Sequence, residues 1–213
     1  MKRLKRVTNW RNTIINYLKN NSKEYILVIL IFIIGVFMGV MLLNNTSTGT
    51  QDIITRYIAE FIEKFKNVKE INTIELSISS IKNNLLLAIA LWGAGTTIIG
   101  MPIVLGIILF RGFCLGYTVA SINFTLGLGK GILFCILSLF LQNIFFIPAI
   151  LTIGVSSIKL YKSIIADRRK ENIKIEIIRH TLISIIMLTM LIVASVVENK
   201  VSLQLLKFGI KYI

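Results

Sequence analysis

The chain has 213 residues, of which 55% are hydrophobic and only 16% are charged, and its mean hydropathy is +0.79. It nevertheless carries 24 Lys and Arg residues against 10 Asp and Glu residues, a formal net charge of +14. Hydrophobic and charged residues occupy different stretches of the chain, which excludes a disordered protein. The same segregation argues against a nucleic-acid-binding protein, because that class needs a basic stripe on a folded surface. The composition is that of an integral membrane protein with its charges in the loops.

Five hydrophobic stretches are long enough to cross about 30 Å of hydrocarbon as α-helices. They lack the period-2 alternation of a membrane β-barrel, so we predict an all-α, polytopic helical bundle in a single membrane domain, residues 1–213. The region 85–129 is too long for one span, and we predict a turn at Arg111, the only charged residue inside it. The predicted spans are residues 25–43, 85–109, 112–129, 131–157 and 181–197. The first is longer than the apolar core of a signal peptide (about 7–15 residues), so we expect a retained helix.

The distribution of charge predicts the topology. Residues 1–24 contain seven basic residues and one acidic residue, and residues 158–179 contain seven basic and three acidic residues. The loop 44–84 contains five of each. The positive-inside rule therefore places 1–24 and 158–179 in the cytoplasm, 44–84 outside, and the tail 198–213 outside. Three spans would keep the same sidedness if 112–157 formed re-entrant segments.

The predicted external loop contains an amphipathic helix. Its apolar side chains recur at spacings of four, three, four and three, which places them on one helix face. These residues are Ile54, Ile58, Phe61, Phe65 and Val68. The helix either lies on its own membrane surface or docks a helix or domain of a partner. For a partner outside the membrane, residues 52–70 and 198–213 are the expected surfaces.

Glycine residues predict close helix packing at the centre of the bundle, because small residues let helix backbones approach closely in lipid. Two GxxxG motifs are present, one at Gly35 and Gly39 and the other at Gly112 and Gly116. Four more glycines occur in the second predicted span: Gly93, Gly95, Gly100 and Gly106. Pro102 lacks a backbone donor and is expected to kink or end that helix.

Three polar residues lie within the hydrophobic stretches. Arg111 has two interpretations. A charge inside the membrane costs on the order of 3 kcal/mol, which favours a functional role. Alternatively, Arg111 lies at a helix end and extends its guanidinium to the membrane surface. Gln142 and Asn143 lie near the middle of the fourth span, with Pro148 five residues after Asn143. They link helices by hydrogen bonds, or they line a solute path with Arg111 in a small transporter or permease component.

The motifs of enzymes and metal sites are missing from the sequence. Residues 127–131 resemble a phosphate loop only superficially, because Gly131 follows Lys130 where Ser or Thr belongs, and Phe124 stands where the first glycine belongs. Cys114 and Cys135 lie in apolar spans, and His180, the only histidine, is expected at the membrane interface. The motifs His-Glu-x-x-His and Gly-x-Ser-x-Gly do not occur. We therefore expect a protein without catalytic, cofactor-binding or metal-binding residues.

Four stretches of the chain resemble a known family. They are residues 92–104 (WGAGTTIIGMPIV), 111–119 (RGFCLGYTV), 142–148 (QNIFFIP) and 198–202 (ENKVS), the last followed by Leu205, Leu206, Lys207 and Phe208. These stretches resemble stage II sporulation protein M of endospore-forming bacteria. The length of the chain and the layout of its spans are also similar, so the resemblance covers nearly the whole chain. One departure is Leu141, where the family has proline.

The resemblance implies a non-enzymatic membrane scaffold that acts in engulfment, when the mother-cell membrane migrates around the forespore. It implies a protein complex at the sporulation septum for peptidoglycan remodelling. The partners would be cell-wall hydrolases resembling stage II sporulation proteins D and P, which cleave peptidoglycan outside the membrane. Membrane lipid and further copies of the chain are the other expected contacts, and we expect no nucleic acid, metal or cofactor.

Overall fold

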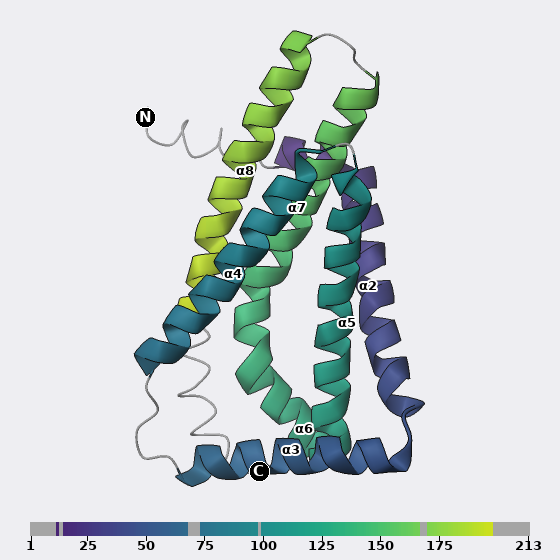
Figure 1. Ribbon diagram of the computed structural model, residues 1–213, viewed down its shortest axis with the longest axis vertical. Coiled ribbons are helices and arrows are strands. Elements are labelled where there is room, and N and C mark those ends of the chain that lie inside the picture. The colour runs from purple at the N-terminus through teal and green to yellow at the C-terminus, as the bar shows by residue number, and fades with distance from the viewer. Residues whose placement is uncertain (1–11, 13–14, 68–72, 98, 167–169, 198–213) are drawn as a thin grey trace.

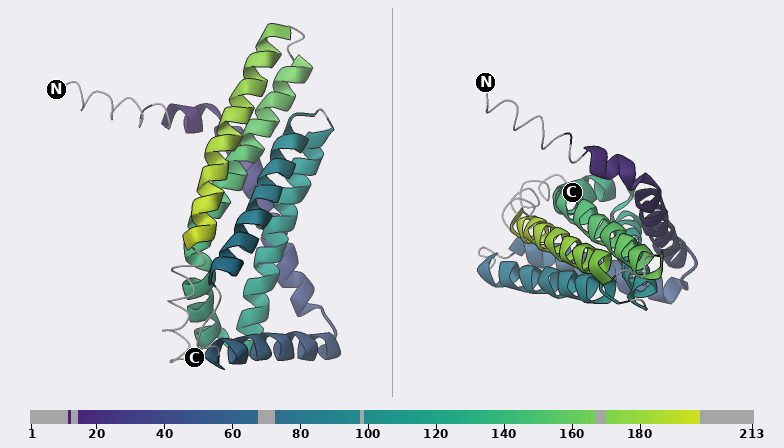
Figure 2. Two further views of the ribbon diagram at one scale, coloured as in Figure 1. Left: turned by 60° about the vertical axis from the view of Figure 1, so that its left-hand side comes forward. Right: turned by 90° about the horizontal axis from the view of Figure 1, so that it is seen from above.

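The computed structural model describes residues 12, 15–67, 73–97, 99–166 and 170–197, which form helices and short turns (Figure 1). Most of the helices run along the long axis of the molecule, and one lies across an end (Figure 2). In chain order the helices are α2 (Ser22–Asn44), α3 (Thr48–Asn67), α4 (Thr73–Gly95), α5 (Gly100–Leu126), α6 (Leu128–Cys135), the π-helical turn η1 (Ile136–Phe140), α7 (Leu141–Ala166) and α8 (Lys170–Val197).

The two ends of the bundle differ in composition. At one end α2 begins, α4 turns into α5, and α7 approaches α8 (Figure 1). We call this the basic end, because the described residues near it include Lys159, Lys162, Lys174 and Arg179. We call the other end, where α3 lies and α5 meets α6, the α3 end. The helices alternate between the two ends in the order that the charge distribution predicts.

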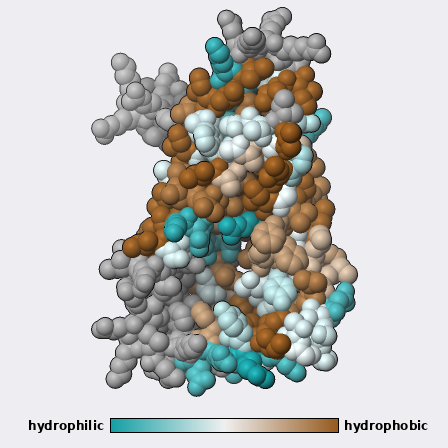
Figure 3. All heavy atoms as spheres, in the orientation of Figure 1, coloured by the Kyte–Doolittle hydropathy of each residue, from teal (hydrophilic) through white to brown (hydrophobic). Residues whose placement is uncertain are grey.

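Four helices in the described part of the chain are long and apolar enough to cross a membrane: Ser22–Asn44, Gly100–Leu126, Gln142–Ile165 and Ile173–Val197. Large hydrophobic side chains are exposed along them. Figure 3 shows apolar side chains over much of the upper half of one face, a hydrophilic patch near its middle, and hydrophilic side chains along α3 at the lower end. This is an all-α, multi-pass membrane protein, with four such helices where the sequence predicts about five. The helix not counted among these four is α4, because Lys82, Asn83 and Asn84 interrupt its apolar residues.

The predicted helix boundary in the central region is wrong. α5 continues without interruption from Gly100 to Leu126, so the chain does not turn at Arg111, and the predicted spans 85–109 and 112–129 do not correspond to helices. The chain turns instead between the end of α4 at Gly95 and the start of α5 at Gly100. There the hydroxyl groups of Thr96 and Thr97 donate to the carbonyls of Gly93 and Ala94, at 2.7 and 2.9 Å. These bonds satisfy carbonyl groups that the end of α4 leaves without helical partners.

Pro102 lies in the first turn of α5, where its missing N–H group has no helical acceptor to lose. The helix break expected at this proline therefore occurs just before it. Gly100 permits the turn, because a Cβ atom at this position would overlap the carbonyl group of Ala94.

Helices extend beyond the predicted spans elsewhere in the chain. Residues 73–84, predicted as external loop, form the first half of α4, and most of the predicted cytoplasmic loop 158–179 belongs to α7 and α8. The predicted span 131–157 includes η1 and parts of α6 and α7. Charged residues mark where the hydrocarbon is expected to end, but a helix can continue into water because its backbone hydrogen bonds are internal.

A hydrophobic core fills the space between α2, α4, α5, α7 and α8. Its fully buried members include Val28, Leu91, Ile108, Ile150 and Leu191, one from each of these helices. A smaller cluster at the α3 end contains Ile122 of α5 and Phe134 of α6.

α2 and α5 pack backbone against backbone through the two GxxxG motifs. A Cβ atom on any of the four glycines would overlap a carbonyl oxygen of the opposite helix. Gly35 and Gly39 meet the carbonyls of Leu109 and Phe113, and Gly112 and Gly116 meet those of Phe32 and Val36. The contact is reciprocal, so each motif makes room for the helix that carries the other.

We expect Gly112→Ala to lower the free energy of unfolding by about 1–3 kcal/mol, because its Cβ would force α2 away from α5. Gly106 in the same helix has open space around its Cβ position. Gly106→Ala should therefore leave the stability unchanged or raise it by up to about 1 kcal/mol. Thermal unfolding of the purified protein in mild detergent, followed by circular dichroism, measures both. Equal melting temperatures for the two variants would contradict the packing described.

Candidate functional site

A buried polar cluster joins α4, α7 and α8 near the basic end. His180 of α8 is only 1% exposed, so it packs between helices rather than facing the membrane surface. Its Nδ1 atom lies 3.0 Å from Oγ of Ser156 on α7, and its Nε2 atom lies 3.4 Å from the carbonyl oxygen of Trp92 on α4. A neutral imidazole whose Nε2 donates to the carbonyl and whose Nδ1 accepts from the hydroxyl uses both nitrogens. The ring therefore links three helices.

Gly95 makes room for this cluster. A Cβ atom at this position would lie 2.7 Å from Nε2 of His180 and would overlap Oγ of Ser157. Beside the cluster, the indole Nε1 of Trp92 donates to Oγ1 of Thr181 on α8 at 3.1 Å. Residues 92–100, part of the first stretch that carries the family resemblance, thus form the end of α4, the turn, and the contact with α8.

Burial distinguishes the Ser156–His180 pair from a catalytic dyad. A serine nucleophile must reach its substrate, whereas Ser156 and His180 are both buried among the helices. Their hydrogen bond holds α7 against α8.

A second polar link joins α4 and α8 farther from the basic end. The buried Asn84 donates through Nδ2 to Oγ of Ser195 at 2.8 Å and to the carbonyl oxygen of Leu191 at 3.3 Å. Sequence analysis missed Asn84 because it assigned this residue to a loop. The signal that could have found it is its spacing from Ala88 and Leu91, four and seven residues later, which places all three on one buried helix face.

Arg111 lies inside α5, eleven residues after Gly100, so the expectation that it extends from a helix end is wrong. Its guanidinium carbon lies 5.5 Å from the centre of the Phe146 ring on α7. A cation over an aromatic ring is attracted by the ring quadrupole, by about 0.5–2 kcal/mol. Arg111 thus contributes to the contact between α5 and α7.

Gln142 and Asn143 lie at the start of α7, directly after the π-helical turn. Nδ2 of Asn143 donates to the carbonyl oxygen of Leu139 within η1, at 2.8 Å. Phe146, the partner of Arg111, lies one helical turn after Gln142. Arg111 of α5 therefore contacts a neighbouring helix, whereas the hydrogen bond of Asn143 stays within its own segment and does not link two helices. Pro148 lies within α7, with its side chain exposed.

α3 lies across the end of the bundle and divides its apolar side chains between two directions (Figures 1 and 2). Ile58 packs against the cluster of Ile122 and Phe134, and Ile54 is half-buried. Ile53 and Tyr57 are exposed to 66% and 72%, and Phe61, four residues further on, to 46%. The side chain of Phe65 and the whole of Val68 fall outside the described residues.

A short connection, residues 45–47, holds α3 at its angle to α2. The hydroxyl of Thr46 donates to the carbonyl oxygen of Leu42 at 2.6 Å, and Nε2 of Gln51 donates to that of Leu43 at 3.2 Å. The first bond satisfies a carbonyl at the end of α2, and the second ties the start of α3 back to the same end.

Charged and aromatic side chains join the segments at the basic end. Nζ of Lys162 on α7 forms an ion pair with Glu24 of α2. Nζ of Lys159 lies 5.3 Å from the centre of the Tyr17 ring. Burial raises the pKa of Tyr17 to about 12.

Among the described residues, no group of three His, Cys, Asp or Glu side chains is arranged to hold a metal ion. Cys114 and Cys135 are half-buried free thiols.

One family model matches most of the chain: stage II sporulation protein M matches residues 28–202. The chain belongs to this family. Comparison with curated proteins and with solved structures found no match. The family match includes both GxxxG motifs, the turn between α4 and α5, and the π-helical turn. The protein is therefore a sporulation-related membrane protein.

Two glycines separated by one residue provide a matched test of the polar cluster. Gly95→Ala should lower the free energy of unfolding by about 1–3 kcal/mol, because the new methyl group would displace His180 and Ser157. Gly93 has open space around its Cβ position, so Gly93→Ala should not destabilise the protein. Melting temperatures in detergent measure the difference. A Gly95→Ala protein as stable as Gly93→Ala would argue against the cluster.

Proposed function

We propose that this protein is a non-enzymatic membrane scaffold that acts in engulfment during endospore formation and anchors peptidoglycan-degrading partners at the septal membrane. Membership of the family supports a role in sporulation. The anchoring role is supported by the surface of α3.

The observation that carries the proposal is the exposed apolar stripe of Ile53 and Tyr57 on α3. The two side chains lie on successive turns of one helix face. Exposed charged residues of the same helix lie around them: Asp52, Arg56 and Glu60. An apolar and aromatic centre with a polar rim is typical of protein–protein interfaces, in which tyrosine is enriched.

The proposed orientation places this surface where the partners act. With the basic end in the cytoplasm, as the positive-inside rule predicts, the α3 end faces the cell wall. The partners proposed are those that the family resemblance implies, cell-wall hydrolases resembling stage II sporulation proteins D and P. They would supply the chemistry, and α3 would supply a fixed surface against which they dock.

The test compares two double variants of α3 in sporulating cells. Ile53→Ser with Tyr57→Ser removes the apolar stripe, and Asp52→Ser with Glu60→Ser changes exposed polar residues of the same helix. Loss of interface anchors costs about 2 kcal/mol or more, so the first variant should retain at least about tenfold less cell-wall hydrolase. The second should retain as much as the unaltered protein.

Retained hydrolase is measured by quantitative mass spectrometry after affinity purification in mild detergent, and engulfment by microscopy of stained membranes. The proposal fails if the unaltered protein retains no cell-wall hydrolase. It fails for this surface if both double variants retain the same amount.

A further inference from the structure

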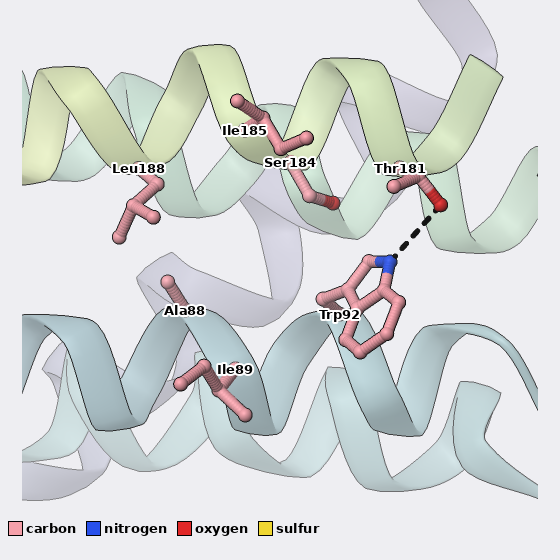
Figure 4. A pocket seen from close by; sticks show the side chains of 7 residues that line it. All are labelled: Ala88, Ile89, Trp92, Thr181, Ser184, Ile185 and Leu188. Atoms are coloured by element: carbon pink, nitrogen blue, oxygen red, sulfur yellow. Dashed lines mark hydrogen bonds between the residues drawn. The ribbon is translucent and has the colours of Figure 1, made fainter. Parts of the chain in front are cut away.

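A groove of about 250 Å³ lies between α4 and α8, on a side of the bundle that would face lipid (Figure 4). Ala88 of α4 and Ser184 of α8 are its buried residues, and Ile89 and Ile185 are exposed at its rim. It extends along α8 from Thr181 to Leu188, a rise of about 10 Å. Its lining is otherwise almost entirely apolar, as expected for a surface in contact with hydrocarbon.

The two ends of the groove differ in polarity. Toward the basic end, the indole of Trp92 donates to the hydroxyl of Thr181 (Figure 4). Tryptophan with its N–H group at the polar end is typical of the boundary between hydrocarbon and headgroups. Toward the other end the lining residues are Ala88 and Leu188. A polar end toward the membrane surface and an apolar end toward its centre match a phospholipid, whose glycerol and headgroup lie nearer the surface than its acyl chains.

Ser184 supplies an observation that points to a ligand. It is 5% exposed, it lines the groove, and its Oγ atom has no hydrogen-bond partner among the described residues. A buried hydroxyl without a partner costs about 1–3 kcal/mol. Ser184 lies about one turn below Thr181, at a depth suited to the ester carbonyl of a lipid, whose oxygen would accept a hydrogen bond from the hydroxyl.

Charge indicates the class of lipid. Lys174 precedes Thr181 by seven residues, so it lies about two turns nearer the basic end on the same face of α8. Its side chain is exposed. Basic residues at the membrane surface between helices bind anionic headgroups. Lys162 and Arg179 add positive charge near the same end, although each also pairs with a glutamate.

We propose that the groove between α4 and α8 binds one anionic phospholipid, with an acyl chain between Ala88 and Leu188, its ester carbonyl at Ser184, and its headgroup extending from the level of Trp92 toward Lys174. A transmembrane helix is a poorer fit, because it is about 10 Å wide and packs on faces of small residues. Here the isoleucines at the rim stand on both sides of the groove. This inference does not depend on the proposed scaffold role.

The test uses Trp92 as the reporter. The chain has two tryptophans, so Trp10→Phe in the full-length protein leaves Trp92 as the only one. The protein is reconstituted in phosphatidylcholine vesicles that contain increasing fractions of phosphatidylglycerol with brominated acyl chains, which quench nearby indole. A second series exchanges the label: brominated phosphatidylcholine is diluted with unlabelled phosphatidylglycerol. It measures how strongly bulk lipid quenches Trp92. We expect phosphatidylglycerol to bind at least three times more tightly than phosphatidylcholine.

Three variants assign the preference to the groove. Lys174→Gln should abolish it, whereas Lys19→Gln, which removes the same charge from an exposed position outside α8, should retain it. Ser184→Leu fills the groove and should also abolish it. Circular dichroism and elution volume check folding, and because Lys174 is exposed, Lys174→Gln keeps the test decisive if Ser184→Leu does not fold.

Equal quenching by the two lipids in the parent protein would overturn the proposal, as would a preference unchanged by Lys174→Gln. So would a disulfide between two copies through Ile185→Cys, in a background with Cys114→Ser and Cys135→Ser. That cross-link would assign the groove to a second copy of the chain.

Discussion

The contact between the backbones of α2 and α5 is the constraint on which much of the bundle depends. Within lipid, helices associate through van der Waals packing and hydrogen bonds, because the lipid tails are as apolar as the side chains. Glycine in a helix is about 1 kcal/mol less favourable than alanine, and the four glycines of the two motifs offset this cost by letting the helices approach. Their approach brings Val28 of α2 and Ile108 of α5 together over Gly154, where α7 packs against both.

The other half of the bundle is held in a different way. α4 and α8 are joined by polar side chains, at Asn84 with Ser195, at Trp92 with Thr181, and through His180. Interhelical hydrogen bonds in membranes average somewhat under 1 kcal/mol, but their geometry tolerates little sliding. Glycine contacts therefore set how closely α2 and α5 approach, whereas polar contacts set the register of α4 against α8. The groove extends along α8 from the Trp92–Thr181 hydrogen bond toward the link between Asn84 and Ser195.

Sequence analysis predicted the all-α class, the family and the amphipathic helix that is α3, because these follow from local hydropathy, charge and short motifs. It misplaced the turn of the central region because a charge in an apolar run usually marks the membrane surface, whereas Arg111 is accommodated inside the bundle over Phe146. The Thr96–Thr97 pair was the better signal for the turn. Burial of His180 depends on how α4, α7 and α8 face one another, and no single segment encodes that.

The three-residue connection between α2 and α3 has a mechanical consequence. Hydrogen bonds from Thr46 and Gln51 tie it to the last turn of α2, which leaves it little slack. A pull on α3 would therefore pass directly to α2, and from α2 through the glycine contact to α5. Partners held at α3 in the proposed scaffold would pull against the whole helical bundle and the membrane around it, so that the force of a moving membrane could reach the cell wall without first stretching a tether.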